Sequence, residues 1–365
     1  MRPRRRRKAL RPSDQPLAPA RESARAGPIA PADRITAIDI VRGIALFGVM
    51  AINVATIFRV SIFEQFLPDG LDGTRLDRTL YWILMAGIDL KAFALFSFLF
   101  GVGLAIQYDH LCASPRRTAL LVRRLAVLML IGAIHLTVIW NGDILFEYAI
   151  ASFVVLPFLA CRLRILAGVG IALLAVFVAS SFLPALVPLP SKTWMIQNVA
   201  EATRIYGSGS LAEVLAFRLH ELPGFLPLHV FMFPRTVALM FLGAAAWRAG
   251  FFRTGSPASR SLPLLAAIGL LAGGTLAISH VNGWLGVGWR AELSLERVGT
   301  VLLACGYGLG LFGKLGVAAA LAIGIGVYFL QGVFSACWLK RYLYGPMEWL
   351  WRSAMYGTRQ PLWRA

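Results

Sequence analysis

The sequence predicts an all-α protein, a polytopic transmembrane helical bundle with a cytoplasmic N-terminus. Hydrophobic residues make up 58% of the 365 residues and charged residues only 15%, whereas soluble domains have about half and a quarter. Apolar runs of about 18 residues or more, the length that crosses a bilayer, recur along the chain. These runs are continuous rather than alternating, which excludes a membrane β-barrel.

The first 34 residues form a basic arm that differs from the rest of the chain. They are rich in Arg, Pro and Ala, and their ten basic and three acidic residues give a charge of +7. Such a segment buries too little apolar surface to fold, so we expect residues 1–34 to be disordered. The net charge of the whole chain, +18, indicates cytoplasmic loops and anionic lipid rather than a specific nucleic acid partner.

The bundle itself is expected over residues 35–337. To within a few residues, we place its membrane segments at 38–58, 80–107, 121–139, 144–161, 165–186, 225–247, 262–282, 298–313 and 315–336. Basic residues gather on alternate connections, namely the N-terminal arm and the loops that carry Arg116, Arg162 and Arg248. Because positively charged loops stay in the cytoplasm, this alternation places the N-terminus inside.

The C-terminal end leaves the number of spans at eight or nine. Nine spans would put the basic residues of 338–365 outside, against the charge rule. Segment 298–313 has only 16 residues, so at about 1.5 Å per residue it reaches about 24 Å, short of a hydrocarbon core of about 30 Å. We expect that it does not span alone, or that a neighbouring helix is missing. Residues 338–365 interleave Trp, Tyr and Arg, which predicts an interfacial segment.

Three polar residues share one side of the first segment, in the stretch DIVRGIALFGVMAIN. At 100° per residue, Arg42 and Asn53 are three turns and about 20° apart, and Asp39 lies about 60° from Arg42. Lipid contact would be costly, so we expect this stripe to face the bundle interior. Two roles remain open for it: a structural Asp39–Arg42 pair, or an Arg42 that binds an anionic ligand such as a phosphate.

A second polar group surrounds the turn at residues 140–143, which reads WNGD. The Asn-Gly pair predicts a tight turn between two helices. His135 precedes this turn, and Asp143 and Glu147 follow it at i,i+4 spacing. A histidine beside a carboxylate is the minimal unit of a general base with its orienting group. The alternative is a packed histidine that only forms hydrogen bonds.

Arg235 is the third candidate, because it lies about ten residues inside an apolar segment. A charge at that depth indicates a binding site. The alternative is a structural salt bridge to Asp39, Asp143 or Glu147.

Other features predict no cofactor or metal site. The connection 187–224 is long enough to cover an outer mouth, and His220 within it is expected to be an exposed loop residue. GYGLGLFG lacks the following Lys of a phosphate loop. The four cysteines lack metal-ligand spacing and lie in or beside apolar runs, where they are expected to pack without disulfides.

Six segments between about residue 34 and residue 357 carry a family resemblance. They read RITAIDIVRGIALFGVMAIN, FALFSFLFGVGLA, RRLAVLMLIGAIHLTVIWNGDILFEYA, ALMFLGAAAWRAGFF, GYGLGLFG and GPMEWLWRSAMYG. In this order they resemble the YeiB-like family of bacterial inner-membrane proteins, a domain of unknown function. That family is similar in turn to transmembrane acyltransferases, including heparan-α-glucosaminide acetyltransferases. The shared element is Asp-x-x-Arg-Gly, here Asp39, Arg42 and Gly43.

The chain departs from these relatives at two points. The heparan branch takes its catalytic His from the stretch after the first helix, but this chain has no His between residues 54 and 109. His135 is assigned that role from local chemistry alone. The Gly-Arg-Met-Ala-Leu-Thr-Asn-Tyr pattern that usually precedes GYGLGLFG is also absent. A helix is therefore expected to be missing, which leaves a degenerate, non-catalytic copy as one interpretation.

The resemblance implies acyl transfer across the bacterial inner membrane as the expected function. The co-substrate would be a cytoplasmic acyl-CoA, with Asp39, Arg42 and Arg235 as substrate-binding residues. An extracytoplasmic glycan or lipid would be the acceptor.

In that interpretation His135 is the general base that deprotonates the acceptor, Asp143 or Glu147 orients it, and Asn53 donates to the developing oxyanion. The alternative is a transporter in which Arg235, Arg42 and Glu147 bind an anionic solute or relay protons. The oligomeric state stays open.

Overall fold

A computed structural model describes residues 36–57, 61–67, 75–139, 141–183, 188–253 and 255–311. Within these ranges the chain is helical and contains no strand. The expected N-terminal arm, the segment 315–336 and the interfacial segment 338–365 lie outside the described residues.

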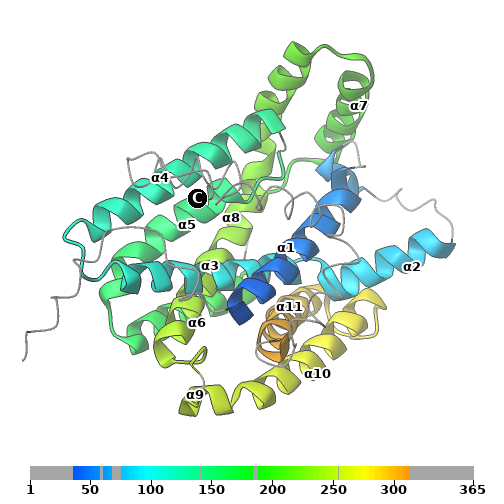
Figure 1. Cartoon of the computed structure of the whole chain (residues 1–365). Coiled ribbons are helices and arrows are strands. Elements are labelled where there is room, and N and C mark those ends of the chain that lie inside the picture. Colours follow the sequence, from blue (N-terminus) through cyan, green and yellow to red (C-terminus); the bar gives the residue numbers. More distant parts are fainter. Residues whose placement is uncertain are drawn as a thin grey trace, which may run out of the picture.

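The described chain runs through α-helices joined by short 3₁₀ and π segments (Figure 1). The α-helices are α1 (Thr36–Ile57), α2 (Arg75–Ile83), α3 (Lys91–His110), α4 (Arg117–Ile134), α5 (Leu145–Val155), α6 (Leu163–Ala179), α7 (Lys192–Ser208), α8 (Leu211–Ala249), α9 (Pro257–Arg260), α10 (Leu262–Val281) and α11 (Trp289–Leu311). The short segments are η3 (Ile62–Phe66), η4 (Leu84–Ile88), η5 (His135–Ile139), η6 (Leu156–Ala160) and η7 (Ser180–Phe182).

Five helical stretches are long and apolar enough to cross a bilayer. They are Arg78–His110, Arg117–Ile139, Leu163–Phe182, Leu211–Ala249 and Leu262–Val281. A shorter apolar helical stretch covers Leu145–Ala160. These stretches confirm the all-α fold class of a membrane protein, while the number of spans and the side of the N-terminus stay predictions.

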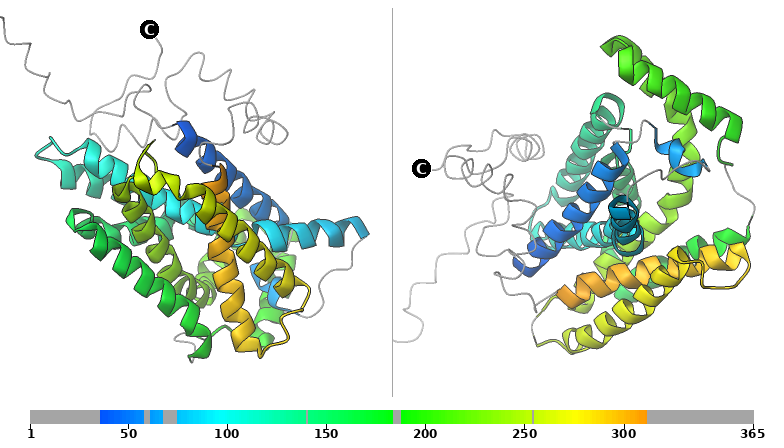
Figure 2. Two further views of the ribbon diagram at one scale, coloured as in Figure 1. Left: turned by 90° about the horizontal axis from the view of Figure 1, so that it is seen from below. Right: turned by 90° about the vertical axis from the view of Figure 1, so that its right-hand side faces the viewer.

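The helices pack both against their neighbours in sequence and against more distant helices. α3 and α6 both pack against α8, α4 packs against α5, and α10 packs against α11. Figures 1 and 2 show α7 and the first part of α8 extending beyond the other helices. Close approach of α3 to α8 depends on glycine: a Cβ at Gly101 would collide with the Met240 carbonyl, and one at Gly243 with the Phe98 carbonyl.

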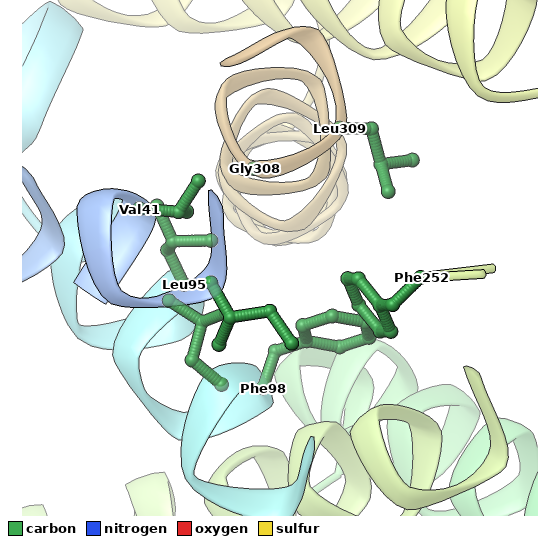
Figure 3. A pocket seen from close by; sticks show the side chains of 8 residues that line it. Val41, Leu95, Phe98, Phe252, Gly308 and Leu309 are labelled. Atoms are coloured by element: carbon green, nitrogen blue, oxygen red, sulfur yellow. The ribbon is translucent and has the colours of Figure 1, made fainter. Parts of the chain in front are cut away.

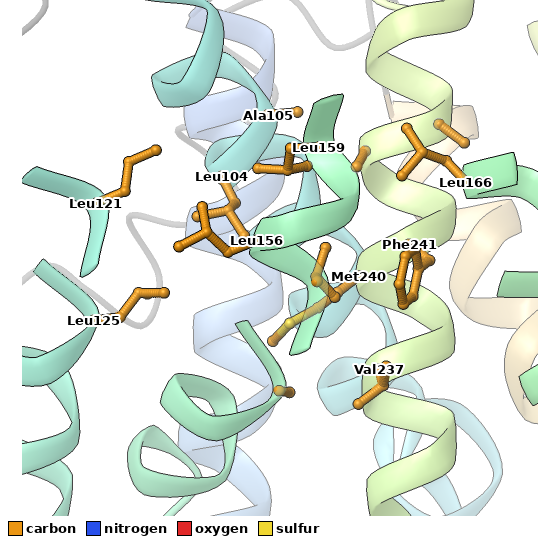
Figure 4. Close-up of a cluster of buried hydrophobic side chains, with 14 of the residues drawn as sticks. Leu104, Ala105, Leu121, Leu125, Leu156, Leu159, Leu166, Val237, Met240 and Phe241 are labelled. Carbon is orange, nitrogen blue, oxygen red and sulfur yellow. The ribbon is translucent and has the colours of Figure 1, made fainter. Parts of the chain in front are cut away.

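The largest buried cluster joins α3, α4, α5, η6, α6 and α8 (Figure 4). Its members include Leu104, Leu121, Leu125, Tyr148, Leu159, Leu166, Met240 and Phe241. Since lipid tails are as apolar as these side chains, the cluster stabilises the bundle through van der Waals packing rather than through exclusion from water.

Two expected elements have a different form. The segment 80–107 is interrupted at Asp89 and Leu90, where Leu90 has a left-handed backbone with φ of 57°. The connection 187–224 is mostly helical, because α7 fills its first part and α8 begins at Leu211 behind a capping box of Ser210 and Glu213. The expectation that His220 lies in a loop was therefore wrong, although its side chain is exposed.

The segment 298–313 is part of a longer helix that is not among the five stretches long and apolar enough to cross a bilayer, so the expectation that it does not span alone stays a prediction. It is the C-terminal part of α11, whose 23 residues extend about 34 Å. The helix starts nine residues earlier because the charged side chains of its first half have partners. Thr300 donates a hydrogen bond of 2.9 Å to Glu296, and Arg297 Nη1 donates one of 2.7 Å to the Phe177 carbonyl.

Candidate functional site

The seven predicted site residues do not meet in a single place. Asp39 and Arg42 contact each other, His135 contacts Asp143, and Glu147 contacts α8 close to Arg235. Asn53 is half-buried on α1, and no hydrogen bond joins it to the other predicted residues within the described chain.

The Asp39–Arg42 pair forms as predicted. Nη1 of Arg42 lies 3.2 Å from Oδ1 of Asp39, and both side chains are partly exposed. The guanidinium also packs on α3, because a Cβ added to Gly103 would collide with its Nη2. Neighbouring residues of α1 line a small pocket between α1, α3 and α11 (Figure 3). All its lining side chains are apolar, so the pocket offers no side-chain group to an anion.

His135 begins the π segment η5 at the end of α4 and faces the turn before α5. Its Nδ1 lies 2.9 Å from Oδ1 of Asp143, within ion-pair range but without the angles of a hydrogen bond. The other carboxylate oxygen, Oδ2, accepts a 2.7 Å hydrogen bond from the Phe146 backbone N–H and so caps α5. Burial raises the pKa of Asp143, and the backbone N–H groups and His135 oppose this effect only in part.

Glu147 contacts two residues of α8. Its Oε2 lies 2.9 Å from Nδ1 of His229, and its Oε1 accepts a 2.7 Å hydrogen bond from Thr236 Oγ1. The Glu147 carboxylate is mostly buried, whereas the His229 side chain is 37% exposed. A carboxylate that holds one imidazole nitrogen leaves the other available to exchange a proton, as a general base requires.

The sequence did not predict the pairing of His229 with Glu147. His229 and Thr236 are seven residues apart, two turns of α8, and therefore lie on one face of the helix. That spacing is visible in the sequence, but the choice of α5 as the facing helix depends on tertiary packing. Asp143 and Glu147 face different helices, so they do not form the pair of repelling carboxylates that their i,i+4 spacing indicates.

Arg235 is buried, with 4% of its surface exposed. Its guanidinium carbon lies 5.9 Å from the ring centre of Phe177 in α6. The described chain provides no salt bridge to it, which contradicts the alternative of a pair with Asp39, Asp143 or Glu147. The reason is angular: Arg235 is turned by about 100° from Thr236, the residue that contacts Glu147.

Two further charged residues, Asp89 and Lys91, lie at the break before α3, and the sequence does not mark them as site residues. Asp89, at the break between η4 and α3, lies in electrostatic range of Lys91, Glu296 and Arg235. Lys91 is buried and donates a 2.8 Å hydrogen bond to the Met85 carbonyl. A charged residue at the start of a membrane helix resembles a surface residue in sequence, so only the break in the helix identifies its buried position.

A separate polar network lies between α7, α8 and the turn before α5. Glu221 on α8 is 1% exposed. It accepts a 2.7 Å hydrogen bond from Asn141 Nδ2, and the Ser61 hydroxyl bridges Asn198 at 2.8 Å and Glu221 at 3.4 Å. The carboxylate is thus enclosed by donors, which fits a structural clasp better than a reactive group.

Comparison with known proteins supports the family resemblance. Residues 293–358 match the family described as a protein of unknown function, DUF418. The chain is 31% identical over 388 residues to the uncharacterized protein YxaH of Bacillus subtilis (strain 168), with 90% of this chain and 96% of YxaH covered. It is 25% identical to the uncharacterized protein YeiB of Escherichia coli (strain K12), with 88% and 96% covered.

An uncharacterized 39.9 kDa protein in the amylase 3' region of Bacillus acidopullulyticus is also 25% identical, with 92% of this chain and 97% of that protein covered. No solved structure matches the chain. The similarity to YxaH extends over nearly the full length of both proteins. The chain therefore belongs to the YeiB-like family of proteins of unknown function.

Proposed function

We propose that this protein transfers an acyl group from a cytoplasmic acyl-CoA to an acceptor on the other side of the bacterial inner membrane, with His229 as the general base. The observation that carries the proposal is the contact of Glu147 with both His229 and Thr236. The resemblance of the Asp39, Arg42 and Gly43 motif to transmembrane acyltransferases supports acyl transfer as the chemistry.

The reaction needs one group that exchanges a proton in both directions. In this proposal Nε2 of His229 takes the proton from a hydroxyl or amine of the acceptor, whose oxygen or nitrogen then attacks the thioester carbon. The carbon–sulfur bond breaks, and the CoA thiolate leaves with the proton that His229 holds. Glu147 stabilises the imidazolium, because its carboxylate faces Nδ1.

The other predicted residues keep the roles that the sequence predicts, at separate places in the bundle. Arg42, which pairs with Asp39, binds the phosphates of acyl-CoA on the cytoplasmic side, and Arg235 binds an anionic part of a substrate. Asn53 donates to the oxyanion. His229 replaces His135 as the proposed base, because the contact of His135 with Asp143 lacks hydrogen-bond geometry.

The proposed topology has eight or nine spans and a cytoplasmic N-terminus. It is supported by the arginines on alternate connections, such as Arg116, Arg162 and Arg248. The proposed partners are the lipid bilayer and a glycan or lipid acceptor. Reporter fusions after Ala365 test the arrangement, because the side of the reporter decides between an even and an odd number of spans.

A transfer assay in membranes tests the proposed chemistry. Acetyl-CoA labelled in the acetyl group is supplied on the cytoplasmic side of inner-membrane vesicles that contain the full chain, and label in the lipid and glycan fractions is measured. We expect His229→Gln to lower the transfer rate about 10²-fold to 10⁴-fold. His220→Gln, on the exposed side of the same helix, is the matched control and should retain the rate. Equal rates for His229→Gln and the wild type would exclude His229 as the base.

One observation favours transport of an anionic solute as a second candidate function. The stretch Arg78–His110 is long enough to span the membrane but breaks at Asp89 and Leu90, with the buried Lys91 directly after the break. Broken membrane helices often form the binding sites of transporters. In that function Arg235, Arg42 and Glu147 bind the solute or relay protons.

Uptake into proteoliposomes separates the two candidates. Uptake of labelled phosphate that is lost in Arg235→Ala supports transport, whereas label transfer that is lost in His229→Gln supports acyl transfer. If the purified wild-type chain does neither, the degenerate, non-catalytic copy becomes the better interpretation.

A further inference from the structure

We propose that Arg235 and Arg297 form a buried site for a phosphoryl group, the headgroup of a lipid phosphate or a free phosphate. This inference deepens the proposed function, because Arg235 is its substrate-binding residue. The site lies between α6, α8 and α11, and Phe177 and Phe231 form its apolar walls.

Both arginines are buried and incompletely bonded. Each has only 4% of its surface exposed. The Nε atom of each is buried and has no hydrogen-bond partner within the described chain. A charged group removed from water without a partner destabilises the folded state. An anionic ligand would remove this destabilisation.

The neighbouring acidic side chains do not supply the missing partner. The Glu147 carboxylate already contacts His229 and Thr236. The Glu296 carboxylate accepts a hydrogen bond from the Thr300 hydroxyl. Asp89 interacts electrostatically with Arg235, but the two side chains do not form a salt bridge. Arg235 therefore lies beside carboxylates that already have their own donors.

Arg297 forms hydrogen bonds through Nη1, whereas its Nε has no hydrogen-bond partner within the described chain. Its Nη1 donates hydrogen bonds of 2.7 Å to the Phe177 carbonyl and 2.8 Å to Ser180 Oγ at the end of α6. This contact stabilises the carbonyl end of that helix. It also fixes the guanidinium beside the ring of Phe177, at 5.0 Å from its centre, while Arg235 lies 5.9 Å from the same ring.

The arrangement favours a phosphoryl group over other anions. Two guanidinium groups bring two positive charges and planar sets of N–H donors, which match the several oxygens of a phosphate. Since α8 and its neighbours include membrane-length helices, the phosphate can come from a lipid headgroup or from solution. The experiment below distinguishes these two sources.

Thermal unfolding of the full chain in a neutral detergent tests the site. The probes are inorganic phosphate and dioctanoyl phosphatidate, and their controls are chloride at equal ionic strength and dioctanoylglycerol. We expect at least one phosphate probe to raise the Tm by about 3 °C or more at saturation. A response to both probes assigns the site to phosphoryl groups in general, and a response to phosphatidate alone assigns it to a lipid headgroup.

Arg235→Gln provides the decisive comparison. This variant should lose the phosphate-dependent rise, yet without any probe its Tm should be no lower than that of the wild type, because it removes a buried charge that has no salt bridge to the described residues. Arg235→Lys should retain a weaker response. Arg204→Gln removes the same charge from an exposed position of α7 and should respond as the wild type does.

Three results would overturn the inference. They are a wild-type chain that responds to neither phosphate probe, an Arg235→Gln variant that keeps the full response, and an Arg235→Gln variant that is less stable without probe. Binding is measured without an acyl donor, so this inference and the proposed function fail separately. A chain that binds phosphate and transfers no acyl group keeps the site and loses the enzymatic role.

Discussion

Asp143 and Glu147 lie one helical turn apart, yet their carboxylates face different helices and contact different histidines. Asp143 lies 2.9 Å from His135 at the end of α4, and Glu147 lies 2.9 Å from His229 on α8. The two acids therefore form two separate His–carboxylate pairs. Among the described residues, only the Glu147 pair is extended by a second side-chain donor, Thr236, and only that pair is close in sequence to a buried arginine.

This separation predicts an energetic coupling that a double-mutant cycle can measure. Glu147→Gln and His229→Gln should couple by about 0.5–3 kcal/mol in the free energy of unfolding, the range for residues in one hydrogen-bond network. Glu147→Gln and His135→Gln should be additive to within about 0.5 kcal/mol. Denaturant unfolding of the detergent-solubilised chain gives both values. Coupling of Glu147 to His135 rather than to His229 would contradict the observed pairing.

The membrane helices could be predicted from the sequence because their signal is local. Residue counts and hydropathy place the ends of α1, α4 and α10 close to the expected segments. The break at Asp89 and the full length of α11 could not be predicted, because both depend on buried partners for charged side chains. As charged residues, Glu296 and Arg297 favour a loop when the sequence is taken alone. In the structure Glu296 accepts a hydrogen bond from Thr300, and Arg297 donates one to the Phe177 carbonyl.

The candidate site was only partly predictable for the same reason. The Asp39–Arg42 pair follows from i,i+3 spacing within one helix, and His135 with Asp143 follows from a tight turn. The partners of Glu147 lie more than 80 residues away on α8. No periodicity within one segment specifies which face of α8 meets α5.

The contact between α3 and α8 predicts a large cost for one added methyl group. A Cβ at Gly101 would collide with the Met240 backbone carbonyl, which cannot move without shifting α8. Gly101→Ala should lower the free energy of unfolding by about 1–3 kcal/mol or more. Gly168→Ala in α6 has no atom within 4 Å of the new Cβ, and should stabilise by about 0.5–1 kcal/mol. Equal unfolding midpoints for the two variants would contradict this packing.

The contact of Arg42 with Gly103 predicts an effect on binding with little effect on stability. A methyl group at Gly103 would displace Nη2 of Arg42, which is the end of a flexible and partly exposed side chain. If Arg42 binds acyl-CoA, Gly103→Ala should raise the KM for acyl-CoA about tenfold with kcat unchanged, as expected for the loss of a charge-assisted contact. Gly168→Ala, on α6 and outside the Asp39, Arg42 and Gly43 motif, puts a new Cβ where no atom lies within 4 Å and is the control in the same kinetic assay. An unchanged KM in Gly103→Ala would exclude this role for Arg42.

Asp143 predicts a pH dependence of stability at the turn between two membrane helices. Burial raises the pKa of this carboxyl above its ordinary value of 3.8, so the folded state holds the proton more tightly than the unfolded state. This contribution to stability is present below the ordinary pKa and is lost as the pH rises through the folded pKa. Between about pH 4 and pH 8, the Tm should therefore fall more in the wild type than in Asp143→Asn.

The asparagine keeps an oxygen that can cap α5, so a loss of the cap does not explain the difference between the two proteins. His135 lies 2.9 Å from the same carboxyl, which makes His135→Gln a necessary second variant. An identical pH profile of Tm in the wild type and Asp143→Asn would exclude a raised pKa at Asp143.

The buried Glu221 predicts that α7 is held by a polar clasp. Truncation in Glu221→Ala leaves the amides of Asn141 and Asn198 without their acceptor, and each unsatisfied buried group costs about 1–3 kcal/mol. Glu221→Gln retains one acceptor oxygen and should cost less. Glu201→Ala, on an exposed position of α7, should have almost no effect.

Because Ser61 and Asn198 come from different segments, Glu221→Ala should also increase protease cleavage within α7 before the rest of the bundle unfolds. Cleavage of α7 at the wild-type rate, together with an unchanged Tm, would show that apolar packing of Phe63 against Trp194 and Phe225 holds this part of the molecule without the carboxylate.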